Sequence, residues 1–438
     1  MTDHANAAII TVGTWTQEDS GGSVLLKRRA DQGSLARKIQ PATVAPESPA
    51  LPELTMNQTF HSLRLRHATW LELFFDLVFV AVIGVMAHRL AHTDHGEIQS
   101  EQLLSFFLVF VPAWWVWAGH TLFANRYDTD SVWQRLCTIA VMALVLVMSL
   151  FIKDVGGNGY PGFVLTYLAM QAVLTLAYFT APQTTPAGDA LARGMGIATL
   201  VGMVISSTSL LIAGQWKFTL LYAGIIAQLL LMASLNDKAR AFPVHREHLI
   251  ERIGLFAIIV LGETVIRIVG SFIAREQYDI FDAIAAAAGF LLIVQVWWIY
   301  FGALYLLERA KRIQSGLVVL VSNLLLYVGI IFLANLTGHA INGDLNPQTF
   351  SMLGVTGAVL FYLGKQIPYF MAYPPLRVPT VVNTVVCLGI TVIATFLPRP
   401  EYSLLMMCFG MFVYVQLNLR WTIPLHNVDA YTLVEETA

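Results

Sequence analysis

The chain has 438 residues, of which 56% are hydrophobic and only 12% are charged, and its formal net charge is −2 at pH 7. Soluble domains usually carry about 25% charged residues. This composition therefore excludes an ordinary soluble protein and indicates an all-helical protein that crosses the lipid bilayer many times. The near-neutral charge gives no reason to expect a nucleic-acid partner. Three cysteines lie inside apolar runs, so we expect buried thiols and neither disulfides nor metal ligands: Cys137, Cys387 and Cys408.

Residues 1–60 form a polar N-terminal segment that contains "TQEDSGGS" and the basic "KRRADQGSLARK". It has no apolar stretch followed by a cleavage site, so it does not resemble a secretory signal. A segment of this composition cannot bury enough apolar surface to fold alone. We expect a disordered cytoplasmic tail over 1–60 and a short cytoplasmic C-terminal tail over 425–438.

Apolar runs bounded by turn residues predict twelve membrane-spanning helices. The tight connections "GGNGYPG" and "YPPLRVP" separate neighbouring runs, because helix cannot continue through them. The predicted spans are 70–91, 103–123, 134–152, 161–180, 194–213, 217–235, 249–273, 281–306, 316–338, 349–370, 378–397 and 402–419.

Lysine and arginine are distributed unevenly between the two sides of these spans. If the N-terminus lies inside, most of the 26 basic residues fall on inner segments. Basic residues are enriched in cytoplasmic loops. We therefore predict that both termini face the cytoplasm and that the chain resides in the inner (plasma) membrane.

The first and last six spans resemble each other in order and loop length, which predicts two tandem six-helix repeats over 61–236 and 237–424. "WLELFF" aligns with "LIERIG", so Glu72 falls on Glu251. "PAWWVWAG" aligns with "VQVWWIYFG", so the pairs Trp114–Trp115 and Trp297–Trp298 coincide. Repeats with an even number of spans run in the same direction through the membrane.

Two carboxylates open the first span, and their spacing places them on one helix face. Asp76 lies about 9 Å inside Trp70 at 1.5 Å per residue. Polar groups at that depth generally face the bundle interior or water. The alternative is a helix-end acidic pair that is held by Arg66 or by an inner-loop arginine. We interpret Glu72 as an anchor at the inner mouth and Asp76 as a group lining the inner end of a polar path.

Glu263 and Arg267 are the deepest charges of the sequence. The acid precedes the base by four residues, which is the favourable order for an ion pair within one helix. Such a pair could simply neutralise itself and help helices to pack. It could also be a gate or an ion-binding acid in the transport path.

Two further groups could bind a ligand. His88, His92 and His95 share one helix face and could bind a transition metal, although histidines at helix ends are often only hydrated, and we expect no metal. The tryptophans of the two aligned segments could line a central vestibule, although such stripes usually serve packing. That vestibule would comprise Trp114, Trp115, Trp297 and Trp298.

The sequence contains no P-loop, nucleophile elbow, HExxH or dinucleotide-binding glycine motif. We therefore expect no cofactor and no enzymatic activity. The polar groups inside the spans instead favour a protein that moves a small solute or ion along a path between the repeats, with proton coupling as one option. A passive cation channel and a non-transporting membrane sensor or scaffold are the alternatives.

Two segments carry a family resemblance. "RHATWLELFFDLVFVAVI" and "HLIERIGLFAIIVLGETV" resemble the paired signatures of the bacterial low temperature requirement A family, and the resemblance runs from about Arg64 to Trp421. It implies a multi-span membrane protein linked by name to growth in the cold. The residues that match its motifs are Glu72, Phe75, Asp76, Glu251, Arg252, Gly262 and Glu263.

"FFD" at the start of the first span is also similar to the FSD signature of lysosomal-type potassium channels, which have two six-span repeats. Phe75 stands where that pattern has serine, and the second repeat has "RIGLF" without an aspartate. These departures weaken the comparison with a channel filter.

Overall fold

A computed structural model describes residues 68–273, 277, 279–310 and 312–422. They all belong to one compact unit, Leu63–Ala438. The predicted tails over 1–60 and 425–438 lie outside the described residues.

Twelve helices in the described part of the chain are long and apolar enough to cross a membrane, which confirms the twelve predicted spans and the all-α membrane fold. A short helix, α8 (Asn236–Ala241), joins the two halves. The first half comprises α2 (Trp70–Arg89), α3 (Ser100–Tyr127), α4 (Val132–Ser149), α5 (Tyr160–Phe179), α6 (Pro186–Ser207) and α7 (Trp216–Ser234). The second comprises α9 (Arg246–Ile273), α10 (Ile280–Arg309), α11 (Leu317–Asn342), α12 (Pro347–Ala372), α13 (Arg377–Ala394) and α14 (Pro400–Leu417).

Several helices begin at residues that satisfy their first free N–H groups. Thr69, Ser131 and Asp279 each form a capping box with the side chain three residues later. Proline occupies the first turn of α6, α12 and α14, where its missing N–H costs nothing. Apolar runs do not record such polar ends, which is why α9 starts before the predicted position 249 and α3 extends past 123.

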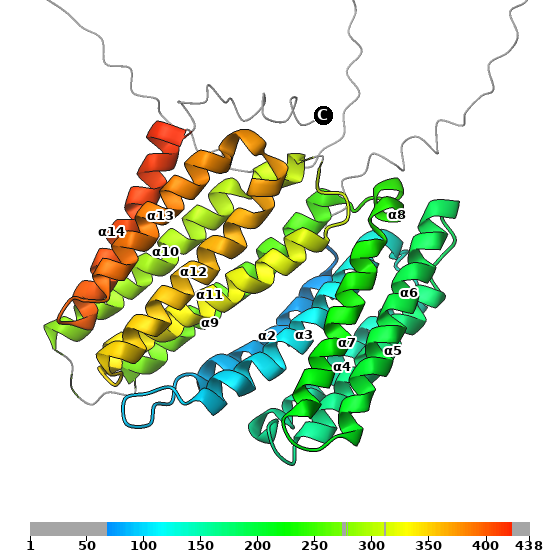
Figure 1. Cartoon of the computed structure of the whole chain (residues 1–438), viewed down its shortest axis with the longest axis horizontal. Coiled ribbons are helices and arrows are strands. Elements are labelled where there is room, and N and C mark those ends of the chain that lie inside the picture. Colours follow the sequence, from blue (N-terminus) through cyan, green and yellow to red (C-terminus); the bar gives the residue numbers. More distant parts are fainter. Residues whose placement is uncertain (1–67, 274–276, 278, 311, 423–438) are drawn as a thin grey trace, which may run out of the picture. The chain divides into compact units, whose positions relative to one another are not determined.

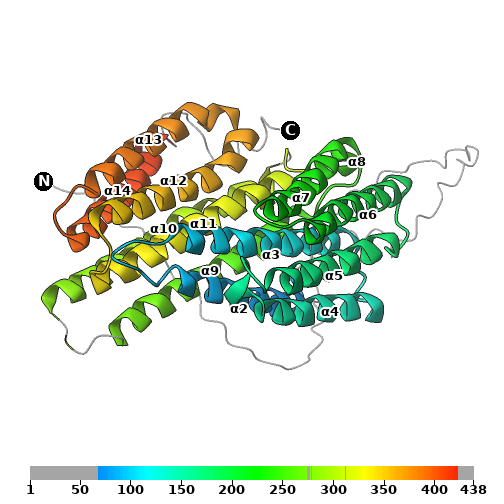
Figure 2. The ribbon, with the colours of Figure 1, turned by 60° about the horizontal axis from the view of Figure 1, so that its bottom comes forward.

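Helices α3 and α11 are the most enclosed elements. Every residue over 112–127 of α3 and over 326–341 of α11 is buried. A helix that is apolar around its whole circumference packs on all sides. Contacts between the halves are made by α2 and α3 with α9 and α11, while α4–α7 and α12–α14 lie to either side (Figures 1 and 2).

The two halves pack their helices in the same order. In each half the first helix contacts the second and the third, and the third to sixth helices pack in succession. This shared order supports the predicted duplication, which stays a prediction. The burial is not equivalent, however, because the second helix is central in the first half and the third is central in the second half.

Glycines allow α11 and α12 to approach backbone to backbone. A Cβ atom added at Gly364 would lie 2.6 Å from the Ser322 carbonyl oxygen and would collide with the Leu326 backbone nitrogen. Gly329 of α11 similarly faces the backbone of Phe361. Small residues at helix interfaces permit this close packing in a membrane.

We predict that Gly364→Ala destabilises the detergent-solubilised protein by about 1–3 kcal/mol, because the added methyl group overpacks the interface. Gly389→Ala is the matched control, since nothing lies within 4 Å of a Cβ atom at that position of α13. Thermal unfolding of both variants checks this. Equal melting temperatures would show that α11 and α12 can separate without cost.

Candidate functional site

Glu72 both caps α2 and faces the other half of the protein. Its Oε2 atom accepts a hydrogen bond from the Thr69 backbone N–H at 2.8 Å, and Thr69 Oγ1 accepts one from the Glu72 N–H at 3.3 Å. The aligned acid in α9, Glu251, accepts a hydrogen bond from the Ala68 N–H at 2.9 Å. The two aligned glutamates therefore accept hydrogen bonds from neighbouring backbone N–H groups, those of Ala68 and Thr69, at the start of α2.

Arg252 of α9 binds both carboxylates of α2. Its Nε and Nη2 atoms donate to the two oxygens of Asp76 at 2.9 and 2.6 Å, and its Nη1 donates to Glu72 Oε1 at 3.0 Å. The side chains of Arg252 and Asp76 are fully buried, and that of Glu72 is 5% exposed. The planar guanidinium suits this arrangement, since its fixed donors match two carboxylates at once.

Aromatic rings enclose the guanidinium. Trp117 of α3 donates from Nε1 to Asp76 Oδ1 at 2.7 Å. The rings of Phe75 and Trp117 lie 5.9 and 5.8 Å from the Arg252 carbon Cζ. They surround the ion pair with apolar groups, so its electrostatic attraction acts in a low dielectric.

His248 extends the cluster toward the α8–α9 connection. Its Nε2 atom lies 3.2 Å from the Glu72 carboxylate, and its Nδ1 lies 3.0 Å from Asn125 Nδ2. Asn125 Oδ1 accepts a hydrogen bond from the His245 backbone N–H at 2.9 Å. The Asn125 atom that faces His248 is therefore Nδ2, which belongs to the NH2 group and is a donor. His248 Nδ1 is therefore placed to accept from this NH2 group, and Nε2 is placed to donate to Glu72. Among the described residues of this cluster, two carboxylates, Glu72 and Asp76, thus face one guanidinium.

A small cavity reaches Glu72 from the same end of α2. Its volume is about 20 Å³, and its lining includes Glu72, His120, Asp130 and Arg135. A cavity of this size holds about one water molecule. His120 Nδ1 is buried without a hydrogen-bond partner among the described residues, so it is available to such a water. At the rim, the hydrogen bonds from Arg135 hold the pKa of the Asp130 carboxyl below its ordinary value.

The structure contradicts the ion pair expected between Glu263 and Arg267. Both residues are described, and no ion pair joins them. The Glu263 carboxylate instead packs against Gly84 of α2, where an added Cβ atom would lie 3.1 Å from Oε2. Arg267 Nη2 reaches toward the Ala91 carbonyl at 3.5 Å. Favourable spacing within one helix therefore does not bring these two side chains into contact.

A second set of contacts joins the halves at the far end of α2. His339 of α11 lies 2.9 Å from the Leu90 carbonyl oxygen and 2.7 Å from Asp344 Oδ1. The Asn346 backbone N–H donates to the Gly96 carbonyl at 2.8 Å. Both ends of α2 are thus bonded to the second half.

The three histidines near this end do not converge. The rings of His88 and His92 meet edge to face at 5.0 Å, whereas His95 lies 3.6 Å from Asp94. Among the described residues, no group of three or more metal-binding side chains could hold an ion.

The four tryptophans of the predicted vestibule lie in different surroundings. Trp114 is buried against Trp117, Phe256 and Tyr327, and Trp115 is also buried. Trp297 and Trp298 on α10 are 47% and 60% exposed. The described structure therefore does not gather them around one space.

These observations define a polytopic helical membrane protein whose halves are joined by a buried cluster of charges. The family model described as bacterial low temperature requirement A protein (LtrA) matches residues 67–415, and the chain belongs to this family. A similar protein is the uncharacterized protein RA0937 of Rhizobium meliloti (strain 1021), which is 27% identical over 245 residues. That match covers 53% of this chain and 58% of the relative.

We predict that Arg252→Gln lowers the free energy of unfolding by about 3–5 kcal/mol, because it leaves two buried carboxylates without a cation. Removing all three charges together, as Glu72→Gln, Asp76→Asn and Arg252→Gln, should cost less than the single change. Arg135→Gln is the control, since this arginine forms an exposed pair with Asp130. Thermal unfolding in detergent compares them. If Arg252→Gln were as stable as the Arg135→Gln control, the two carboxylates would already be protonated.

Proposed function

We propose that this protein moves a small solute or ion across the inner membrane and couples that movement to a proton. The observation that supports this is that two buried carboxylates, Glu72 and Asp76, face the single guanidinium of Arg252 in the described part of the cluster. A purely structural ion pair is best balanced, because an uncompensated buried charge costs several kcal/mol. A cluster with one surplus carboxylate gains from binding a proton or another cation.

Protonation would act directly on the contact between the halves. Neutralising Asp76 or Glu72 removes part of the attraction that holds α2 to Arg252 on α9. Ionisable groups inside membrane proteins commonly serve as proton relays for this reason. A water molecule in the cavity beside Glu72 and His120 could carry the proton to the cluster. Glu263 is a second acid on α9, the helix that carries Arg252, and its side chain is partly exposed.

A second candidate is a non-transporting sensor or scaffold. It is favoured by the hydrogen bonding of Arg252, since each of its three guanidinium nitrogens donates to a carboxylate of the cluster and the side chain is fully buried. In that role the charges only fix the position of α2 against α9. A passive channel is the weaker alternative, because Asp76, at the position of the FSD aspartate, is held by Arg252 and Trp117.

Transport in liposomes distinguishes these roles. We expect the purified full-length chain to take up at least one member of a panel of small ions and metabolites, and a pH gradient should change the rate. Asp76→Asn should abolish the effect of the gradient, whereas Arg193→Gln, at an exposed position of α6 outside the cluster and its cavity, should leave it intact.

Two results would contradict proton-coupled transport. Unitary currents that ignore the pH gradient would indicate a channel. Absence of uptake across the panel, with Asp76→Asn altering only thermal stability, would indicate the scaffold.

The proposal places both termini and the α7–α9 connection in the cytoplasm. We predict that Gln215→Cys, at the exposed start of α7, is labelled by an impermeant thiol reagent in intact cells, and that Lys238→Cys on α8 is labelled only after lysis. Both positions are exposed, and the three native cysteines are buried. The reverse labelling pattern would invert the orientation.

A further inference from the structure

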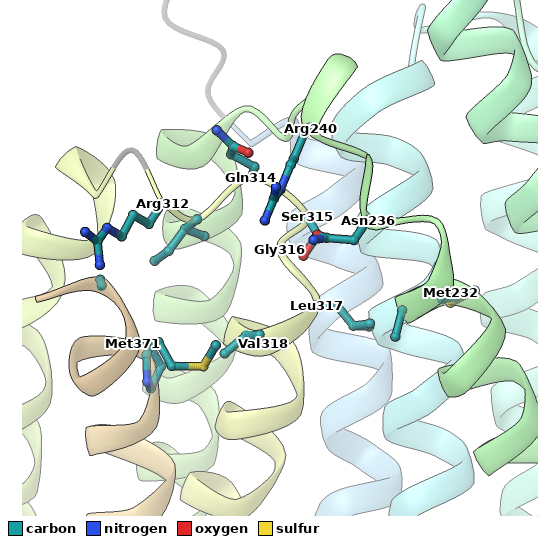
Figure 3. A pocket seen from close by; sticks show the side chains of 14 residues that line it. Met232, Asn236, Arg240, Arg312, Gln314, Ser315, Gly316, Leu317, Val318 and Met371 are labelled. Atoms are coloured by element: carbon teal, nitrogen blue, oxygen red, sulfur yellow. The ribbon is translucent and has the colours of Figure 1, made fainter. Parts of the chain in front are cut away.

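A crevice of about 920 Å³ lies where the ends of α7 and α12 approach the α10–α11 connection. Figure 3 shows Arg240 and Arg312 near its mouth, with Met232, Leu317, Val318 and Met371 farther along its walls. It is far larger than the cavity beside Glu72, and it belongs to a different part of the molecule. It is therefore separate from the charge cluster.

The crevice is positively charged. Arg240 and Arg312 are exposed, and neither forms an ion pair or hydrogen bond with any described residue. No acidic side chain is among the described residues that line it. Arg126 lies behind the wall and is buried, with its guanidinium bound only to the carbonyl oxygens of Phe242 and Ser315 in the described part of the chain. Its charge adds to the potential that an anion would meet.

The wall that carries Gln314 and Ser315 is held in a fixed position. Arg126 Nη2 donates to the Ser315 carbonyl at 2.9 Å, and the Val244 N–H donates to the Gln314 carbonyl at 3.1 Å. Gly316 has a φ of 74°, which allows the chain to turn into α11 at that point. The site is thus built by hydrogen bonds that reach it from α3 and from the segment before α9.

The lining of the crevice has a charged part and an apolar part. Arg240 and Arg312 lie outside the spans, whereas Leu317 and Val318 belong to the first turn of α11 and Met371 to the last turn of α12. Met371 is 52% exposed, so part of this apolar wall is open to its surroundings. A ligand that matches both regions needs an anionic head and an apolar tail.

We propose that this crevice binds an anionic phospholipid, with its headgroup phosphate between Arg240 and Arg312 and its upper acyl chain along Leu317, Val318 and Met371. Arginine suits the phosphate because its donors bind two oxygens at once. Basic pockets between helices at the cytoplasmic surface are known to hold such headgroups. The lipid would bridge α7 and α8 of the first half to α11 and α12 of the second.

Native mass spectrometry of the full-length chain, titrated with defined lipids in detergent, tests the proposal. We expect phosphatidylglycerol to remain bound where phosphatidylcholine does not. Arg240→Gln combined with Arg312→Gln should weaken phosphatidylglycerol binding by roughly 25-fold, at about fivefold per basic residue. The control pair, Arg193→Gln with Lys238→Gln, removes equal charge from exposed positions outside the crevice and should leave binding unchanged.

Two further arms identify the source of the phosphate and guard against misfolding. Glycerophosphate, which has the head without the tail, should not compete with phosphatidylglycerol. Met371→Trp keeps every charge but fills the apolar wall, and it should reduce lipid binding even if the double arginine variant unfolds. The proposal would be overturned if phosphatidylcholine bound as well as phosphatidylglycerol or if glycerophosphate competed with it. It would also be overturned if the control pair lost as much binding as the double arginine variant.

Discussion

One buried guanidinium, that of Arg252, holds two carboxylates of another helix in largely apolar surroundings. The cost of removing three charges from water is offset only where every donor finds an acceptor at good geometry. That requirement fixes the rotation and height of α2 against α9, because Asp76 and Glu72 must both meet the same planar group. The ring of Trp117 and the contact between Asn125 and His248 surround the carboxylates of α2 in this position.

Much of the fold could be predicted because the bilayer imposes length and apolarity on every span, and both are local properties of the sequence. The helix ends were less predictable. Capping by Thr69, Ser131 and Asp279, and the polar start of α9 at Arg246, depend on hydrogen bonds that hydropathy does not record. The central positions of α3 and α11 could not be deduced either, because helices that are apolar on all sides carry no periodic signal of what they face.

The sequence could predict only the part of the site in which residues are close neighbours along one helix. Glu72 and Asp76 share a face by helix geometry alone, but Arg252 lies 176 residues after Asp76, and no periodic pattern connects them. Its place in "LIERI", aligned with "WLELF", was the one available signal. The same spacing brings no ion pair for Glu263 and Arg267, whose side chains lie against Gly84 and toward the Ala91 carbonyl.

Helix α2 is hydrogen-bonded to the second half near both of its ends. It has 20 residues and is therefore about 30 Å long at 1.5 Å per residue. A tilt of about 10° around one end displaces the other by about 5 Å, which exceeds the reach of any hydrogen bond described there. Arg252 and His339 thus hold α2 near its two ends, and a rigid tilt of α2 that kept either contact in place would break the other.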